Sequence, residues 1–375
     1  MAEIFLTIFF ISVLLFFLGS GIWVALSMIG VSAIGMMLFT SRPVGDAMAT
    51  TIWGTASSWT LTALPLFVWM GEILFRTKLS ENLFKGLSPW MQKLPGGLIH
   101  VNVVGCALFA AISGSSAATV ATVGKMSIPE LRKRNYPEKI LLGSLAGSGT
   151  LGLLIPPSII LIIYGVAVQE SIAKLFIAGI IPGIMIALIF MSYVIIWSLI
   201  NKKEMPKILE EYSFLEKIKR SKQLLPVILL ISAVIGSIYT GVATATEAAS
   251  LGVVGALILS YFQKSLTLET FKSSLLGATK TSCMIAFILA GSTFLSLAMG
   301  FTGLPRNLAI WIQGMELSPY VLILVLMIFY IILGMFLDGI SAVVLTMAII
   351  EPMIRQAGFD MIWFGIFLVI VVEMA

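Results

Sequence analysis

The chain has 375 residues, of which 59% are hydrophobic and only 11% are charged, and its mean hydropathy is +1.07. This apolar content exceeds what the core of a soluble protein of this length can bury, so a soluble globular protein is excluded and a membrane must be the solvent. The formal net charge of +5 is spread over short loops rather than gathered on one basic face, which argues against a nucleic-acid partner.

Apolar runs that approach the roughly 20 residues needed for a spanning helix recur along the chain. Among them are Leu175–Ile200, Leu224–Tyr239, Val242–Phe262 and Pro319–Leu337. We predict helices, because unpaired backbone groups are costly in lipid and no β-barrel alternation is visible. The first residues lead straight into an apolar stretch without a basic region or a cleavage site, so a retained first helix is expected. The predicted fold class is an all-α polytopic membrane protein.

Charged loops orient the first half of the chain. The loop from Asn201 to Lys222 is rich in lysine, which marks it as cytoplasmic by the positive-inside rule. Two crossings separate it from the basic loop Lys125 to Lys139, so that loop is expected on the same side. The region from Gly96 to Ser127 then begins and ends on one side, and Ile112 to Ser116 interrupts its apolar sequence. We interpret it as a re-entrant helical hairpin that enters from the cytoplasm.

A second segment has the same design. Apolar Pro319 to Phe336 runs into Leu337 to Ser341 and then into the apolar stretch Ala342 to Ile350. Its flanks are poor in cations, with Arg306 before it and Arg355 after it, so it is expected to enter from the periplasmic side. Two similar hairpins that enter from opposite faces form inverted repeats, which are typical of secondary transporters.

The repeat has a readable register. Ser116-Ala117 pairs with Ser341-Ala342 at an offset of 225, and Pro129 pairs with Pro352 at 223, so we expect a two-residue indel between them. Carrying the second offset forward from Pro156-Pro157 projects a partner proline pair to positions 379 and 380, beyond the last residue. We therefore expect that the sequence lacks a final segment.

These segments predict four parts. Residues 1–93 form N-terminal scaffold helices, and residues 94–200 form the first transport-domain repeat with the first hairpin. Residues 201–318 hold a cytoplasmic loop with scaffold or arm helices. Residues 319–375 form the second transport-domain repeat with the second hairpin.

Two polar interruptions of the first repeat are candidate sites. At the first tip, Gly114 permits a turn that frees carbonyl groups, and Ser113, Ser115 and Ser116 add hydroxyl oxygens, which are ligands that sodium prefers. The alternative is that these small residues only allow close helix packing. The second interruption runs from Gly147 to Ser158, where two prolines remove backbone donors and leave carbonyl groups unpaired. Its alternative is a simple proline kink.

Acidic residues give the remaining candidates. Asp338, at the second tip, is an acid deep in an apolar stretch, and it is either a cation ligand, a helix cap or both. Glu247 is expected at the start of a helix capped by Thr246 or Thr244, which favours a structural role. Glu72 is expected near a membrane face and is the weakest of the three.

Catalytic and zinc chemistry have little support. Cys106 and Cys283 lie inside apolar segments without a CxxC spacing, and His100 is the single histidine. An intramembrane hydrolase would pair His100 with Ser113 or Ser115, but a helix would separate His100 from Ser113 by roughly 20 Å. We predict no enzymatic activity, and a channel is disfavoured because two closed tips leave no open pore lining.

Five collinear strings carry a family resemblance. They are LTALPLFVWMGEILF (Leu61 to Phe75), ISGSSAATVATVG (Ile112 to Gly124), GSGTLGLLIPPSIILIIYG (Gly147 to Gly165), ATATEAAS (Ala243 to Ser250) and GMFLDGISAVVLT (Gly334 to Thr346). In order and along the whole chain they resemble the DctM-type large membrane subunit of TRAP transporters (tripartite ATP-independent periplasmic). One departure is Ala245, which stands where the family often has proline.

The resemblance implies an elevator-type secondary transporter, in which a mobile transport domain with two hairpins slides against a scaffold. It implies import of a small organic anion driven by a sodium gradient, with Na+ as the coupling ion and no other cofactor. The expected partners are a small four-helix membrane subunit, a periplasmic solute-binding protein that delivers the anion, and the lipid of the bacterial inner membrane. Sialic acid, C4-dicarboxylates, other sugar acids and keto acids remain open as substrates. The alternative is a self-sufficient sodium-coupled dicarboxylate or citrate carrier, which would not depend on a binding protein.

The resemblance also assigns residues. Sodium at the first tip is assigned to Ser113, Gly114, Ser115, Ser116, Gly149, Thr150 and Pro156. Sodium at the second tip is assigned to Gly334, Asp338, Gly339 and Ser341, with a partner segment expected beyond the present sequence. Substrate contact is assigned to Thr119 and Thr346.

Overall fold

A computed structural model describes residues 2–76, 79–206, 212–222, 224–303, 307, 314, 318–335 and 337–374. Arg306 and Phe336, which entered the sequence argument, and part of the basic loop after Asn201 lie outside these residues. Every regular element of the described chain is a helix, which confirms the all-α prediction.

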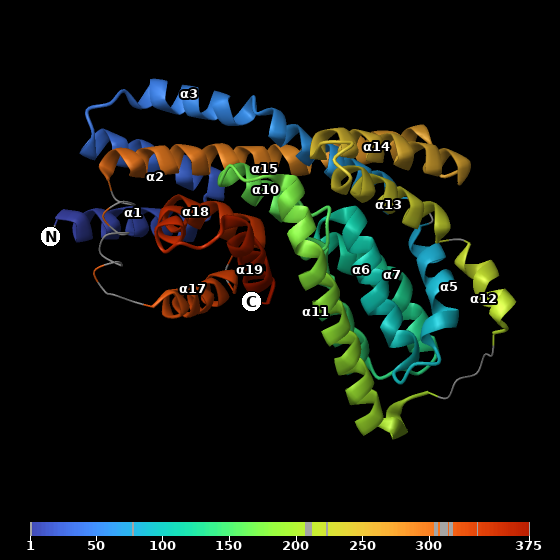
Figure 1. Cartoon of the computed structure of the whole chain (residues 1–375). Coiled ribbons are helices and arrows are strands. Elements are labelled where there is room, and N and C mark those ends of the chain that lie inside the picture. The colour runs from blue at the N-terminus through green and yellow to red at the C-terminus, as the bar shows by residue number, and fades with distance from the viewer. Residues whose placement is uncertain are drawn as a thin grey trace. The chain divides into compact units, whose positions relative to one another are not determined.

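Several helices are long and apolar enough to cross a membrane (Figure 1). Within the described residues five spans meet this test: Glu138–Ala167, Ile172–Ile200, Ala245–Phe262, Leu268–Thr302 and Gly339–Gln356. Two bent helix pairs raise the number to seven if each pair counts as one span. The chain is therefore a multi-pass membrane protein.

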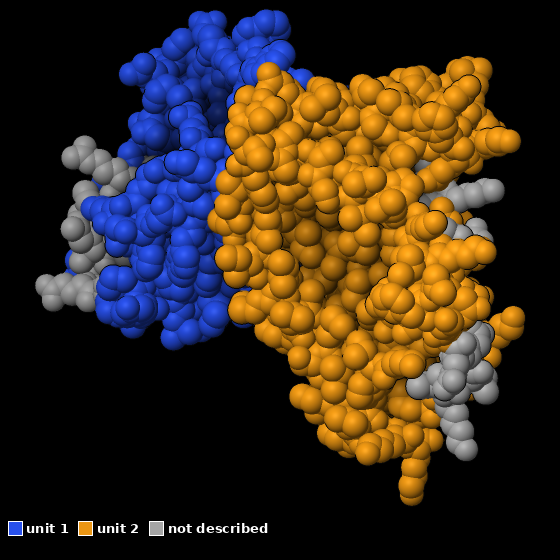
Figure 2. Space-filling model, turned by 45° about the vertical axis from the view of Figure 1, so that its right-hand side comes forward, with its two compact units in different colours: residues 1–62, 162–175, 281–375 blue, residues 63–161, 176–280 orange. Residues whose placement is uncertain are grey.

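The chain divides into two compact units, which Figure 2 colours separately. Unit 1 comprises residues 1–62, 162–175 and 281–375. Its helices are α1 (Ala2–Gly19), α2 (Val24–Phe39), α3 (Val44–Ala56), η1 (Trp59–Thr62), α17 (Pro319–Gly334), α18 (Gly339–Gln356), α19 (Met361–Met374) and the later part of α15 (Leu268–Thr302). Met36 of α2 packs with Phe294 and Ala298 of α15, and the Ser292 hydroxyl of α15 donates to the Val344 carbonyl of α18 at 2.5 Å. These contacts join the N-terminal helices to the second hairpin.

Unit 2 comprises residues 63–161 and 176–280. Its elements are α4 (Ala63–Phe75), α5 (Leu79–Met91), η2 (Gly97–Ile99), α6 (His100–Ser113), α7 (Ser116–Lys133), α8 (Glu138–Gly149), α9 (Leu151–Leu154), η3 (Lys202–Glu204), α12 (Phe214–Ser221), α13 (Leu225–Tyr239) and α14 (Ala245–Phe262). The helices α10 (Ile159–Ala167) and α11 (Ile172–Ile200) belong partly to each unit, as does α15. Within unit 2, α4 packs against α14 and α6, and α6 packs against α7 and α8. The four consecutive parts predicted from the sequence stay a prediction.

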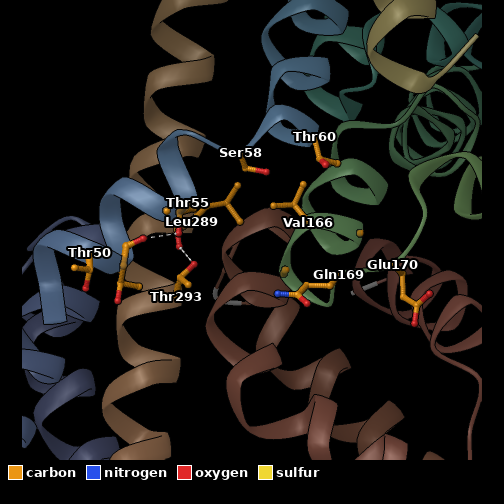
Figure 3. Close-up of a pocket in the computed structure, with 13 residues that line it drawn as sticks. Thr50, Thr55, Ser58, Thr60, Val166, Gln169, Glu170, Leu289 and Thr293 are labelled. Atoms are coloured by element: carbon orange, nitrogen blue, oxygen red, sulfur yellow. Dashed lines mark hydrogen bonds between the residues drawn. The ribbon is translucent and has the colours of Figure 1, made fainter.

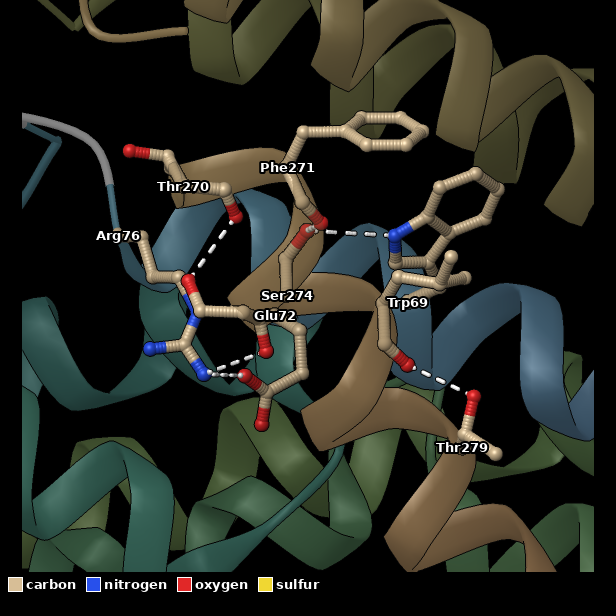
Figure 4. A network of polar contacts seen from close by, with 9 residues as sticks. Trp69, Glu72, Arg76, Thr270, Phe271, Ser274 and Thr279 are labelled. Carbon is tan, nitrogen blue, oxygen red and sulfur yellow. Dashed lines mark hydrogen bonds and ion pairs between the residues drawn. The ribbon is translucent and has the colours of Figure 1, made fainter. Parts of the chain in front are cut away.

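A polar network joins α4 to the first turns of α15 inside unit 2 (Figure 4). Arg76 Nη2 lies 2.7 Å from Glu72 Oε2 and 3.2 Å from the Ser273 carbonyl oxygen. A β-carbon on Gly277 would lie 2.7 Å from the Glu72 carboxylate, so glycine leaves room for the ion pair. Glu72 thus has a cation directly after its own helix, and this ion pair is a sufficient structural role for it.

Candidate functional site

The first hairpin is formed by α6 and α7, which pack against each other (Figure 1). Gly114 ends α6 in the left-handed conformation, with φ of 57°, which glycine adopts without a steric penalty. Ser115 follows in an extended conformation, and its hydroxyl accepts the Ala118 N–H as the N-cap of α7. Two residues therefore reverse the chain direction at the predicted tip.

The open ends of this hairpin lie together. The Tyr136 hydroxyl, after α7, accepts the Leu98 N–H before α6 at 3.0 Å, and burial raises the pKa of this phenol. Ile99 packs with Ile140 of α8 and Val194 of α11. Tyr136, Trp197 and Met205 pack against the same cluster. The loop after α7 and the loop after α11 are thus at one end of unit 2, as the topology prediction requires.

The second interruption is a helix break, and it begins later than the glycines indicate. α8 continues into α9 through Thr150, whose backbone is helical with φ of −61° and ψ of −25°. The chain leaves the helix only at Ile155. The Ser158 hydroxyl donates to the Leu153 carbonyl oxygen, which supplies a partner to a carbonyl group upstream of the prolines. Gly149 therefore lies inside a helix rather than at the break.

The first tip lies directly against the broken helix. A β-carbon on Gly152 of α9 would lie 2.7 Å from the Ser115 carbonyl oxygen and 2.9 Å from the Ser116 nitrogen. A β-carbon on Gly114 would lie 3.1 Å from the Pro157 carbonyl oxygen. The C-terminal ends of α6 and α9 consequently meet at the tip, and both contribute carbonyl groups without intrahelical partners.

A short hydroxyl network organises the tip. The oxygens of Ser113 and Thr119 lie 2.7 Å apart, and the Thr119 hydroxyl also donates to the Ser115 carbonyl at 2.7 Å. Thr119 is fully buried. The Thr150 hydroxyl, one turn from the break, donates to the Gly147 carbonyl at 2.7 Å. The structure thus places the tip from Ser113 to Ser116 against α9, the helical turn that follows Gly149 and Thr150, and hydrogen bonds hold Thr119 in the same tip.

The second hairpin is formed by α17 and α18. Gly334 is the last residue of α17, and Gly339 is the first of α18. Asp338 is the N-cap of α18, and its Oδ2 accepts the Ser341 N–H at 3.1 Å. The helix-cap interpretation is therefore confirmed, while ion binding by the exposed Asp338 stays a prediction.

The two hairpins share a register. Helices α7 and α18 are both 18 residues long, their residue numbers differ by 223 at both ends, and each contains a proline at the same position, Pro129 or Pro352. The N-caps Ser115 and Asp338 are also separated by 223 residues. The indel expected from pairing Ser116 with Ser341 is therefore not needed, because these serines occupy different positions in the first turn.

The hydroxyl group of Thr346 is also hydrogen-bonded within its own hairpin, the second. Its oxygen lies 2.7 Å from the Tyr330 hydroxyl of α17, and its hydroxyl donates to the Ala342 carbonyl at 2.8 Å.

Arg355, at the end of α18, donates to the Val168 carbonyl and lies 3.5 Å from Glu170. These contacts link the second hairpin to the connection between α10 and α11.

The other sequence hypotheses are resolved by local geometry. His100 and Ser113 are the first and last residues of α6, and His100 Nε2 lies 2.8 Å from the Pro95 carbonyl oxygen. A hydrolase dyad between them is thereby excluded. Thr244 caps α14 in a reciprocal capping box with Glu247, which confirms the structural role expected for that acid. No group of three or more potential metal-ligating His, Cys, Asp or Glu side chains occurs in the described part of the chain.

Unit 1 contains a pocket that the sequence analysis missed (Figure 3). Its volume is about 580 Å³, and α3, the following turn, the connection between α10 and α11, and α15 line it. Six of its residues carry hydroxyl groups: Thr50, Thr51, Thr55, Ser58, Thr60 and Thr293. Its one carboxylate, Glu170, is the partner of Arg355. The density of threonine and serine between residues 50 and 60 was the available signal.

Comparison with known proteins identifies the family. The family model described as "Tripartite ATP-independent periplasmic transporter, DctM component" matches residues 9–375. The C4-dicarboxylate TRAP transporter large permease protein DctM of Pseudomonas aeruginosa is 32% identical over 91% of this chain and 79% of its own length. The sialic acid TRAP transporter large permease protein SiaM of Vibrio cholerae is 31% identical over 92% of this chain and 81% of its own. The 2,3-diketo-L-gulonate TRAP transporter large permease protein YiaN of Escherichia coli is 31% identical over 86% and 76%.

These matches extend over almost the whole chain and agree with its apolar helices. They establish a transporter permease rather than an enzyme. The chain therefore belongs to the DctM family of tripartite ATP-independent periplasmic transporters.

Proposed function

We propose that this chain is the large membrane subunit of a sodium-driven TRAP transporter that imports a small organic anion across the bacterial inner membrane. The similar large permeases are named for C4-dicarboxylates, sialic acid and 2,3-diketo-L-gulonate, and all three substrates are small organic acids. A carboxylate is accordingly the substrate class that we propose.

The meeting of two helix C-termini at the first tip carries the sodium part of the proposal. The last carbonyl groups of a helix lack N–H partners and hold a partial negative charge, which favours a cation. α6 and the continuous α8–α9 run end at Ser113 and Leu154, on either side of the close contact between Gly152 and Ser115. Carbonyl and hydroxyl oxygens are the ligands that sodium prefers, so the donor set fits the ion. The Ser113 to Ser116 tip with Gly149, Thr150 and Pro156 remains our proposed first site.

The same tip also contains a helix N-terminus that could attract an anion. α7 begins at Ser116, and the first N–H groups of a helix carry a partial positive charge that attracts a carboxylate. Substrate contact by Thr119 and Thr346 stays a prediction, and both hydroxyls are bonded within their own hairpins. A substrate that met either side chain would have to compete with those bonds.

The transport mode and partners complete the proposal. The common register of α7 and α18 supports two repeats, and we propose that they enter from opposite faces and move together in an elevator-type cycle. A small four-helix membrane subunit and a periplasmic binding protein would act with the chain. The competing candidate is the self-sufficient sodium-coupled carrier for dicarboxylates or citrate.

Uptake by reconstituted vesicles tests this proposal. The permease would be reconstituted with its small subunit, and uptake would be measured with the binding protein and the sodium gradient supplied separately and together. We expect uptake only when both are present. Uptake without the binding protein would support the self-sufficient carrier, and full uptake on a proton gradient alone would contradict sodium coupling.

The double substitution Ser115→Ala with Ser116→Ala tests the first site. Loss of hydroxyl ligands should raise the sodium concentration needed for half-maximal uptake at fixed membrane potential. The control is Ser20→Ala with Ser57→Ala, which removes two exposed hydroxyls bonded within their own helical turns. An unchanged sodium curve in the tip variant would remove these serines from the site.

A further inference from the structure

α12 is a short helix whose sequence explains why it forms. Ser213 caps it, and the Glu216 carboxylate accepts the Ser213 N–H at 2.9 Å, which completes a reciprocal capping box. The described segment from Tyr212 to Lys222 holds four cations, Lys217, Lys219, Arg220 and Lys222, against the single acid Glu216. Four cations against one acid leave this described segment with an excess of positive charge.

The apolar side chains of α12 gather on one face, and they are not covered by the described chain. Phe214, Leu215 and Ile218 follow the spacing i, i+1, i+4, which places them within about 100° around a helix. Their exposed fractions are 67%, 78% and 42%. Three large apolar side chains in this state would be unfavourable in water, so another apolar phase must cover them.

Contacts with α5 fix the orientation of this helix. The Trp90 indole N–H donates to the Ser221 hydroxyl at 2.7 Å, and the Trp90 ring meets the edge of Phe214 at 6.3 Å between centroids. Lys217 Nζ lies 5.4 Å from the centre of the same ring. Trp90 is itself 40% exposed, and an amphipathic aromatic ring of this kind is typical of the boundary between lipid and water.

The neighbouring elements locate this boundary. The spanning helix α11 ends at Ile200, before the segment, and α13 begins at Leu225, after it. Leu225 and Leu229 of α13 are 53% and 57% exposed, so α13 presents apolar side chains to its surroundings as soon as it begins. α12 and α13 meet the length and hydropathy test for a span only as a pair, and the chain bends by 58° between them. A bend of this size fits an arrangement in which α13 crosses the membrane and α12 lies along its surface.

We propose that α12 lies in the membrane interface and binds anionic phospholipid. Phe214, Leu215 and Ile218 insert between acyl chains, while Lys219 and Arg220 on the polar side contact the phosphate groups. Lys222, at the C-terminal end of the helix in line with the apolar face, reaches the phosphates with its long side chain. An amphipathic helix with a basic polar face next to a spanning helix has both terms that interfacial binding needs, namely buried apolar area and attraction to anionic headgroups. This surface shares no residue with the proposed sodium sites, so the proposal does not depend on sodium-driven transport.

Lipid retention tests the charge part of the proposal. The purified protein would be placed in bilayer discs of phosphatidylcholine with added phosphatidylglycerol, and the bound lipid would be measured by native mass spectrometry. Replacement of Lys219, Arg220 and Lys222 by glutamine should lower phosphatidylglycerol affinity by roughly five-fold for each cation removed. The control replaces three exposed cations elsewhere in unit 2, Lys264, Lys272 and Lys280, by glutamine. Equal losses in both variants, or no loss in either, would overturn the assignment.

Depth measurement tests the apolar part on protein with the basic face intact. A fluorophore would be attached at Leu215→Cys and, as the matched site on the polar face, at Glu216→Cys, in protein lacking the exposed Cys283. Nitroxide-labelled lipid should quench the label at position 215 more strongly than the label at 216, and aqueous iodide should show the reverse order. Stronger iodide quenching at 215 would contradict interfacial insertion. Protection of 215 only when the small subunit is present would assign this face to a protein instead.

Discussion

Asp338 combines two properties that one substitution can separate. Its carboxylate accepts the Ser341 N–H as a helix cap, and it is also the acid proposed to attract a cation at the second tip. Asparagine is nearly as good an N-cap as aspartate, whereas alanine is not. The structural and electrostatic roles of this residue therefore predict different responses to Asn and Ala.

We expect Asp338→Asn to retain the thermal stability of the protein and to raise the sodium concentration needed for half-maximal uptake, because the charge that favours a cation is lost. Asp338→Ala should also destabilise α18, by about 1 kcal/mol. Thermal unfolding and sodium-dependent uptake measure the two effects separately. If both measurements for Asp338→Asn match the unchanged protein, Asp338 is a helix cap alone.

The sequence predicted the local caps and turns better than it predicted which side chains form hydrogen bonds at the tips. The turn at Gly114 and the cap at Asp338 follow from local rules, and the sequence predicted the turn and gave the cap as one of two roles for Asp338. For α14 the sequence left Thr246 and Thr244 open, and the structure selects Thr244. The Thr119 contacts could not be predicted, because they depend on how α7 places its first turn beside the end of α6. Local preference specifies a cap, while packing decides which hydroxyl is buried.

At the scale of elements, the glycines of α8 and α9 allow close packing of the helix and do not end it. The sequence predicted an interruption from Gly147 to Ser158, and the break occurs within this stretch, but the helix continues through the glycines and ends only at Leu154. Glycine costs about 1 kcal/mol in a helix, and close packing can offset that cost. Gly149 faces Val120, and Gly152 faces the backbone of Ser115, so the missing side chains allow α7 and the tip to approach. Such packing cannot be predicted from the sequence of α8 and α9 alone, because it depends on the position of α7 and the tip.

The approach of these two elements predicts the effect of Gly152→Ala. The new β-carbon would lie 2.7 to 2.9 Å from backbone atoms of Ser115 and Ser116, and a backbone cannot move aside as a flexible side chain can. We expect a loss of about 1 to 3 kcal/mol in the free energy of unfolding. We also expect weaker sodium dependence of uptake, because the tip must move away from α9.

Gly143→Ala is the matched control for this prediction. Gly143 is also helical, and a β-carbon there meets no atom within 4 Å. This variant should be as stable as the unchanged protein or slightly more stable, since alanine favours helix. Equal stability of both alanine variants would show that α9 does not support the tip.

At the scale of the whole molecule, the order of segments along the chain does not determine which segments pack together. Each compact unit is assembled from stretches that are far apart in sequence, such as residues 1–62 with residues 281–375. Hydropathy and charge reveal where the chain crosses the membrane, because these properties are read along one segment at a time. Partners between segments depend on side-chain shape, so the two-unit arrangement could not be derived from the same patterns.

The orientation of unit 2 in the membrane can be predicted from the basic loops and tested directly. The loop after α7 and the loop after α11 meet at the cluster of Ile99, Ile140 and Val194, so they must share one side. Both are rich in cations, and the positive-inside rule assigns that side to the cytoplasm. The opposite end of α13 leads into the exposed Val242, which should then face the periplasm.

Single cysteines in a protein lacking Cys106 and Cys283 measure this arrangement. Arg134→Cys and Lys203→Cys should both resist a membrane-impermeant thiol reagent added from the periplasm, and both should react after the inner membrane is permeabilised. Val242→Cys should react without permeabilisation, which shows that the reagent reaches the membrane surface. Labelling of both loop cysteines in intact cells would reverse the orientation of the unit. Labelling of only one would contradict the shared end that the packing of Tyr136 and Met205 against one cluster requires.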